Sequence, residues 1–199
     1  RAVGTVCASD QSFLDDLTVT IEEVRGDIVL STHYPESRNW RGNRTAKIDL
    51  VVEMPLNMAV DLDDSSGSME VMGSGALNID DSSGSIFVQG ANGAVTIEDS
   101  SGGVEVMDVA GDLSIDDGSG DVQVRDVQGT VYVDDGSGSV SIEEVEGSVV
   151  VSDGSGSINV ENVAGDFTVR SDGSGGVRHS GVGGTVDVPQ RDRRGRRGN

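Results

Sequence analysis

The chain has 199 residues, a formal net charge of −21 at pH 7, 29 glycines and only 3% aromatic residues. Such acidity argues against nucleic-acid binding, because basic side chains supply most of the affinity for a phosphate backbone. No apolar run approaches the roughly 18 residues of a membrane span, and the opening Arg-Ala-Val-Gly lacks the apolar core of a signal peptide. A chain whose export signal had been cleaved would also begin without that apolar core. Cys7 is the only cysteine, so no internal disulfide is possible.

Residues 1–16 are predicted to be an irregular lead-in, and residues 17–58 to be N-terminal strands with an inserted loop. The stretch 19–31 matches the later stretch 140–152 position for position in pattern. The repeat array is therefore predicted to begin near residue 17, so that 17–58 forms its first turns or a cap. Residues 32–45 carry no strand pattern and are interpreted as a surface loop. Residues 46–54 are predicted to form a strand that Pro55 stops.

Residues 59–188 repeat one short phrase, which reads Asp-Asp-Ser-Ser-Gly at 63–67 and returns with small changes. Self-similarity at a fixed short period is the signature of stacked structural repeats. Each repeat divides into two halves of nine residues, and each half contains a glycine, a small or polar residue, an apolar-x-apolar strand and an acidic corner. The glycines that end the phrase are spaced by 17 to 19 residues, and they are Gly67, Gly84, Gly102, Gly120, Gly138, Gly156 and Gly175.

The apolar residues of the repeats form regular columns. An apolar-x-apolar pattern places both apolar side chains on one face of a strand, because successive residues alternate sides. Helix periodicity is absent. The pattern predicts an all-β parallel β-solenoid of about 18 residues per turn, with two short strands per turn and roughly seven or more turns stacked about 4.8 Å apart. The inward columns begin with Met69, Ile86, Val104, Val122, Val140, Ile158 and Val177 on one side, and with Leu77, Val95, Leu113, Val131, Val149, Phe167 and Val186 on the other.

Glycine is predicted to occupy the corners, where the backbone needs angles that a β-carbon resists. A column of apolar residues, from Ala91 to Val182, is expected to plug one corner from inside. From residue 189 the character of the sequence changes, and 189–199 is interpreted as a basic disordered tail with five arginines. We expect this tail to dock on the acidic edge of a neighbouring copy. The second glycine column comprises Gly75, Gly93, Gly111, Gly129, Gly147, Gly165 and Gly184.

An acidic column is the main candidate for a functional site. It comprises Asp64, Asp81, Asp99, Asp117, Asp135, Asp153 and Asp172, one residue per turn. Neighbouring carboxylates about 5 Å apart repel each other. Each aspartate could offset this by accepting hydrogen bonds from corner N–H groups, as in an Asx turn. Alternatively, Ca²⁺ could lie between turns, although calcium-binding nonapeptide rolls place the aspartate after the glycines and before the strand. The turn-forming role is the expected one.

Catalysis and ice binding are both disfavoured. His33 and His179 lie far apart in the array, and neither has metal-ligand spacing to another residue. The outward-facing columns are irregular, whereas ice binding needs a flat regular array. Trp40 and Tyr34 could grip a sugar or a partner, but packing over the first turns is the expected role of their loop. The sequence therefore assigns no catalytic, cofactor-binding or metal-binding residue, and calcium is the one cofactor left open.

The recurring Gly-Ser-Gly-x-Val-x-Val-x-Asp-Val-x-Gly-x-Val-x-Val-x-Asp resembles the repeat of a bacterial adhesin domain family. Its members are domains of unknown function with Ser-Gly-rich β-solenoid turns. The resemblance covers about 17–188 and includes the Met54-Pro55 entry. It implies a non-enzymatic, extracytoplasmic protein that is secreted, periplasmic or on the cell surface. We therefore expect an acidic rod for surface attachment or for self-assembly into filaments by end-to-end stacking, with a cell-surface or polysaccharide partner, or else a calcium-binding β-roll-like module.

Overall fold

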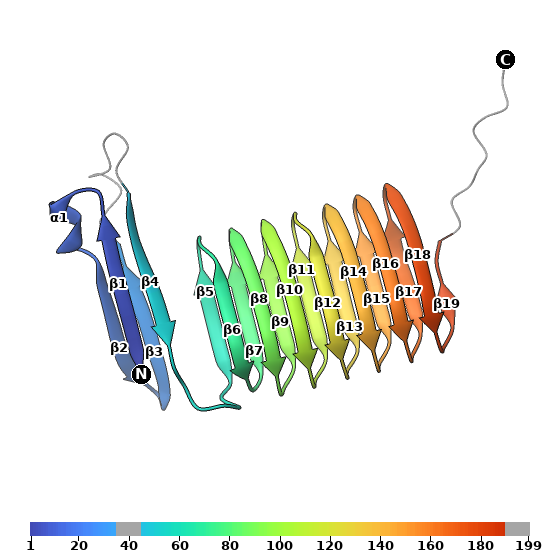
Figure 1. The fold of residues 1–199 in the computed structure, drawn as a ribbon, viewed down its shortest axis with the longest axis horizontal. Helices are drawn as coiled ribbons and strands as arrows, with labels where there is room; N and C mark the ends of the chain where they lie inside the picture. The colour runs from blue at the N-terminus through green and yellow to red at the C-terminus, as the bar shows by residue number, and fades with distance from the viewer. Residues whose placement is uncertain (35–44, 190–199) are drawn as a thin grey trace, which may run out of the picture. The chain divides into compact units, whose positions relative to one another are not determined.

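The computed structural model describes residues 1–34 and 45–189 (Figure 1). It divides into two compact units, Arg1–Pro55 and Leu56–Asn199. The predicted loop at 32–45 lies largely outside the described residues, including Trp40, and so does the arginine-rich end of the tail.

The first unit contains two antiparallel strand pairs. Strand β1 (Ala2–Ala8) pairs with β4 (Ala46–Val52), and β2 (Thr18–Val24) pairs with β3 (Asp27–His33). A short helix, α1 (Gln11–Leu14), lies between β1 and β2, and the Ser12 N–H donates to Oδ1 of its N-cap residue Asp10 over 3.0 Å. Phe13 of this helix is buried, which anchors the lead-in that the sequence had suggested to be irregular.

The prediction that the repeat array begins near residue 17 is wrong. Strands β2 and β3 form an antiparallel hairpin, whereas a solenoid turn would pair them in parallel with later turns. The cause is local: Arg25 and Gly26 both have positive φ, +57° and +98°, which is typical of the two-residue turn that joins hairpin strands. In the matching repeat only Glu144, two residues earlier in the pattern, has a positive φ (+60°). A single positive φ at that position directs the chain around a solenoid corner and does not form a hairpin turn.

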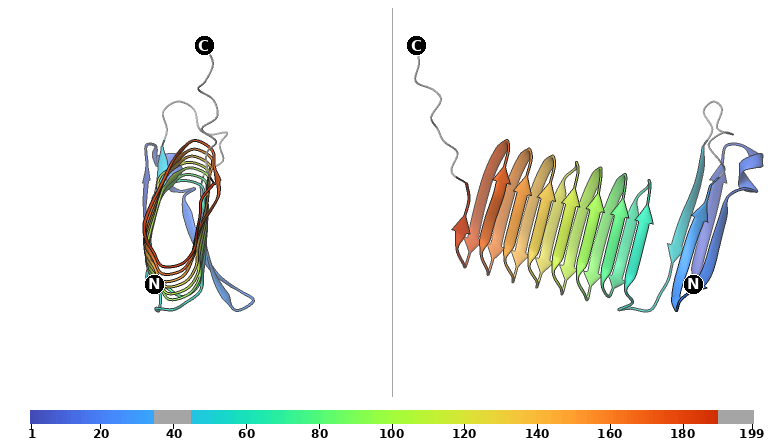
Figure 2. Two further views of the ribbon diagram at one scale, coloured as in Figure 1. Left: turned by 90° about the vertical axis from the view of Figure 1, so that its right-hand side faces the viewer. Right: turned by 180° about the vertical axis from the view of Figure 1, so that it is seen from behind.

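The second unit is a parallel β-solenoid of about seven turns with roughly 18 residues per turn, as predicted. Two parallel sheets, of seven and eight strands, run along it (Figures 1 and 2). The seven-stranded sheet contains β6 (Met69–Ser74), β8 (Gly84–Ala91), β10 (Gly102–Val109), β12 (Val122–Val127), β14 (Gly138–Val145), β16 (Gly156–Val163) and β18 (Gly175–Val182). The eight-stranded sheet contains β5 (Val60–Asp64), β7 (Leu77–Asp81), β9 (Val95–Asp99), β11 (Leu113–Asp117), β13 (Val131–Asp135), β15 (Val149–Asp153), β17 (Phe167–Asp172) and β19 (Val186–Asp187).

The strand register confirms the predicted apolar columns. Val104 of β10 pairs with Ile86 on one side and Val122 on the other, and Leu113 of β11 pairs with Val95 and Val131. The inward residues of the middle turns are nearly inaccessible to solvent, and together they form one continuous core. Each turn thus buries its apolar side chains against the turns before and after it, which is the source of stability in repeat proteins.

The two columns of corner positions require glycine for different reasons. The glycines from Gly67 to Gly175 have φ between +125° and +157°, which L side chains rarely adopt. The second column, from Gly75 to Gly184, has no positive φ, contrary to the expectation that both columns relieve strained angles. Instead, a β-carbon on Gly111 would lie 2.6 Å from the carbonyl oxygen of Gly93. This second column is therefore glycine because successive corners approach each other closely.

Candidate functional site

The predicted aspartate column is present, and it lies at the ends of the strands of the eight-stranded sheet. Each member pairs in register with the next, from Asp64 with Asp81 through to Asp153 with Asp172. Parallel strands lie about 4.8 Å apart, so each carboxyl group has a neighbour of the same kind on either side. The structure therefore brings together all the residues that the sequence grouped in this column.

The column faces the interior, which the sequence analysis did not predict. Asp81, Asp117, Asp135 and Asp153 are 1% exposed, and Asp99 is 5% exposed. The signal was present in the alternation of side chains along each strand. In β13 the inward residues Val131 and Val133 are followed two positions later by Asp135, which therefore points to the same side.

In four of the five buried carboxyl groups, one oxygen caps its own corner. The backbone N–H of the serine two residues later donates to Oδ1 of Asp81, Asp99, Asp117 and Asp135, over 2.9 to 3.2 Å. This is the Asx-type turn that the sequence predicted. The hydroxyl groups of Ser83, Ser101 and Ser119 also donate to a corner carbonyl oxygen of the preceding turn, which favours serine at this position.

The other oxygen of each buried carboxyl group has no hydrogen-bond partner. This holds for Oδ2 of Asp81, Asp99, Asp117 and Asp135, and for both oxygens of Asp153. A buried polar atom without a partner costs free energy, and a buried charge costs much more. These oxygens without a partner, called orphan oxygens below, recur at the same place in successive turns. They are therefore a regular feature of the repeat.

Burial raises the pKa of all five buried carboxyl groups. The pKa of Asp135 rises to about 6; the N–H of Ser137 opposes this shift, whereas the neighbouring Asp117 and Asp153 add to it. Desolvation disfavours the charged form, and a like charge on the next rung acts in the same direction. The column therefore binds protons more tightly than free aspartate does.

A metal site is less well supported by this geometry. In the described part of the chain, no group of three or more His, Cys, Asp or Glu residues is placed to hold a metal ion. Two orphan oxygens from adjacent turns could contact one cation, but Ca²⁺ takes six to eight oxygen ligands. The remaining ligands would have to come from backbone carbonyls of the corners. Many of those carbonyls already accept hydrogen bonds from the next turn, such as Asp81 O from Ser100 N–H.

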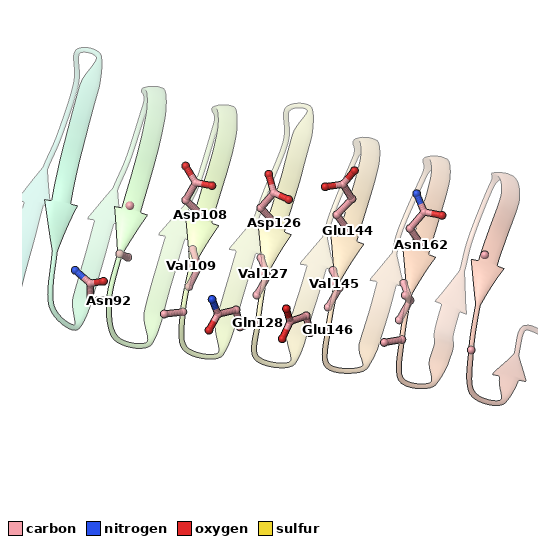
Figure 3. A pocket seen from close by; sticks show the side chains of 17 residues that line it. Asn92, Asp108, Val109, Asp126, Val127, Gln128, Glu144, Val145, Glu146 and Asn162 are labelled. Atoms are coloured by element: carbon pink, nitrogen blue, oxygen red, sulfur yellow. The ribbon is translucent and has the colours of Figure 1, made fainter.

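A groove runs along the opposite corner, over the seven-stranded sheet (Figure 3). It has a volume of about 990 Å³, and buried valines such as Val127 and Val145 form part of its lining. Its rim carries residues in the left-handed conformation, one per turn. With their φ angles, these residues are Gly90 (+80°), Asp108 (+57°), Asp126 (+57°), Glu144 (+60°), Asn162 (+58°) and Gly181 (+70°).

The sequence analysis missed this left-handed column, although its composition carries a signal. Gly, Asn and Asp are the residues that tolerate this conformation best, and they fill every position except Glu144. In Figure 3 the side chains of Asp108, Asp126 and Glu144 follow one another along the rim. The Asp126 carboxyl, which hydrogen-bonds to Glu144, raises the pKa of that residue. The rim is therefore an exposed row of closely spaced acidic groups.

The other candidate residues do not form a site. His33 lies on β3 in the first unit, where its Nε2 is 3.4 Å from the Thr20 hydroxyl. His179 lies on β18 of the solenoid, with its ring centroid 5.8 Å from that of Phe167. The two histidines thus belong to different units. Tyr34 is exposed, and its predicted partner Trp40 lies outside the described residues.

Comparison with known proteins gives no further guide. The chain matches no family model, no curated protein and no solved structure. The resemblance to the adhesin domain family therefore remains an expectation from the repeat pattern. None of the helices in the described residues is long and apolar enough to cross a membrane.

Proposed function

We propose that the chain is a non-enzymatic structural protein of the extracytoplasmic space, in which the solenoid assembles end to end with other copies. One observation carries this proposal: among the described residues, no strand pairs with the outer edge of the last turn, and its apolar side chains stay partly exposed. Within the described residues, β18 pairs only with β16, and β19 pairs only with β17. An open strand edge presents unpaired N–H and C=O groups to another chain.

The apolar side chains of the last turn support the same conclusion. Val186 is 39% exposed, whereas its register partner Phe167 is fully buried. Val177, Val182 and Val188 pack against the core but are only partly buried. A further turn placed on this end would bury them as each inner turn buries its neighbour. Attachment to a cell surface or a polysaccharide would then use the repeated outer faces of the assembled rod.

The assembly can be tested with a charge placed in the open end. Val177→Lys puts an ammonium group at the partly buried end of an inward apolar column, where a stacked copy would have to bury it fully. We expect sedimentation velocity to show a smaller average mass for this variant than for the unaltered chain, and electron microscopy to show shorter rods. Arg178→Lys, at the neighbouring outward position, is the matched control. An unchanged mass distribution for Val177→Lys would contradict end-to-end assembly.

A calcium-binding module is the second candidate. The observation in its favour is the set of orphan carboxylate oxygens inside the solenoid. Calcium that binds only the folded state would raise its stability by mass action. Melting curves with calcium and with a chelator separate the two functions, because the structural function predicts no calcium-dependent shift.

A further inference from the structure

The orphan oxygens of the aspartate column need a positive charge to neutralise them. Five carboxyl groups, from Asp81 to Asp153, lie in register in the interior with at least one oxygen each that accepts no hydrogen bond. Their nearest charged neighbours within the column are other carboxyl groups. No Lys, Arg or His side chain forms an ion pair with them among the described residues; the described ion pairs all lie elsewhere.

We propose that this column is a proton-binding site: in mildly acidic solution, the orphan oxygens carry hydrogen atoms and the buried aspartates are neutral. Protonation removes both the cost of burying a charge and the repulsion between adjacent turns. It also converts each orphan oxygen into a donor, and the carboxyl oxygens of the next rung are acceptors of the right kind. In Asp81, Asp99, Asp117 and Asp135, Oδ1 keeps its hydrogen bond from the serine N–H in either state.

The surroundings of Asp135 show why protons suit this column. Along the column it faces Asp117 and Asp153, and Asp121 adds to their effect from the corner that precedes β12. Each of these neighbours is acidic. On its own strand, the other inward residues are the apolar Val131 and Val133. A proton needs no cavity, whereas a metal ion between two rungs would need space and further oxygen ligands.

The proposal has a consequence for stability with a definite sign. A carboxyl group whose pKa is raised by folding stabilises the folded state below the unfolded pKa, and this contribution is lost as the pH rises through the folded pKa. For Asp135 the window runs from the ordinary value of 3.8 up to about 6. The solenoid is therefore most stable in mild acid and becomes less stable toward neutral pH, opposite to a protein stabilised by ionised, salt-bridged carboxylates.

A neutral isostere tests this inference. Asp135→Asn keeps an oxygen to accept the Ser137 N–H but can no longer take up a proton. We expect the melting temperature of the full chain to fall between pH 5 and pH 8 at constant ionic strength, and to fall less in Asp135→Asn, which becomes the more stable protein at pH 8. The control is Asp134→Asn, an exposed neighbour on the same strand. It removes the same charge, so it corrects for the general self-repulsion of an acidic chain.

Two results of the melting experiments would overturn the proposal. The first is an equal pH dependence in Asp135→Asn and Asp134→Asn. The second is a rise in melting temperature with calcium at pH 8 that Asp135→Asn diminishes, because the column would then hold a metal ion. Infrared spectroscopy of the folded, unaltered chain gives an independent readout. We expect the carbonyl stretch of protonated carboxyl groups at pH 5.5 and its loss at pH 8, and its absence at pH 5.5 would contradict the proposal.

Discussion

Two adjacent glycines show how strongly a single residue controls each corner. Gly102 has φ of +152°, and a β-carbon there would overlap the carbonyl oxygen of Gly84 in the preceding turn. Gly103 has no positive φ, and a β-carbon there would lie 3.8 Å from the carbonyl oxygen of Asp121, an ordinary contact. The two glycines look alike in sequence, yet only the first is required by backbone geometry.

We therefore expect Gly102→Ala to destabilise the solenoid by about 3 kcal/mol or more, because strained backbone and a steric overlap with another backbone segment act together. Gly103→Ala should change the stability by less than about 1 kcal/mol. Chemical denaturation monitored by circular dichroism measures both. Similar losses of stability in the two variants would show that the corner does not depend on the φ of Gly102.

At the scale of the element, the strand in each half of a turn could be predicted from the sequence. The conformation of the corners could be predicted only in part. The apolar-x-apolar pattern gave the strands, their parallel register and the inward columns, because side-chain alternation and an 18-residue period leave few alternatives. The hairpin β2–β3 shares that apolar pattern, but its turn at Arg25 and Gly26 pairs the two strands with each other in antiparallel fashion. The burial of Asp135 follows from the same alternation, but the sequence analysis assigned this residue only to a corner.

The last complete strand, β18, differs from its predecessors at one inward position. His179 pairs in register with Val160, which is fully buried, whereas His179 itself is exposed beside the ring of Phe167. A polar residue at this position makes the open end less apolar, as in the terminal repeats of other repeat proteins. Under the proposed end-to-end assembly, we expect His179 to weaken stacking through β18.

His179→Val should extend the apolar column to the end of the solenoid. We expect this variant to self-associate at a protein concentration several-fold lower than the unaltered chain, because a larger apolar area is buried on stacking. Sedimentation equilibrium over a range of protein concentrations measures the change. Ser180→Val, at the adjacent position of the same strand, controls for the added valine. An association constant that is unchanged by His179→Val would contradict stacking through this end.

At the scale of the whole molecule, charge is distributed unevenly along the chain. Residues 59–188 contain 25 acidic and 3 basic residues, whereas residues 190–199 contain five arginines and one aspartate. The acidic rim of the groove gathers Asp108, Asp126 and Glu144 in successive turns. Opposite charges on different parts of identical chains favour lateral contacts between copies, and salt screens such contacts.

Removal of residues 190–199 should therefore weaken association at low ionic strength and have little effect at high ionic strength. The same loss is expected when the rim is neutralised by Asp108→Asn, Asp126→Asn and Glu144→Gln together, because the rim supplies the closely spaced carboxylates that arginine side chains pair with. Asp63→Asn, Asp80→Asn and Asp116→Asn together remove the same charge from exposed positions on the eight-stranded sheet. Light scattering at two salt concentrations distinguishes these cases. Equal effects of the two triple variants would show that the tail responds to net charge alone, and unchanged scattering after removal of the tail would show that it takes no part in assembly.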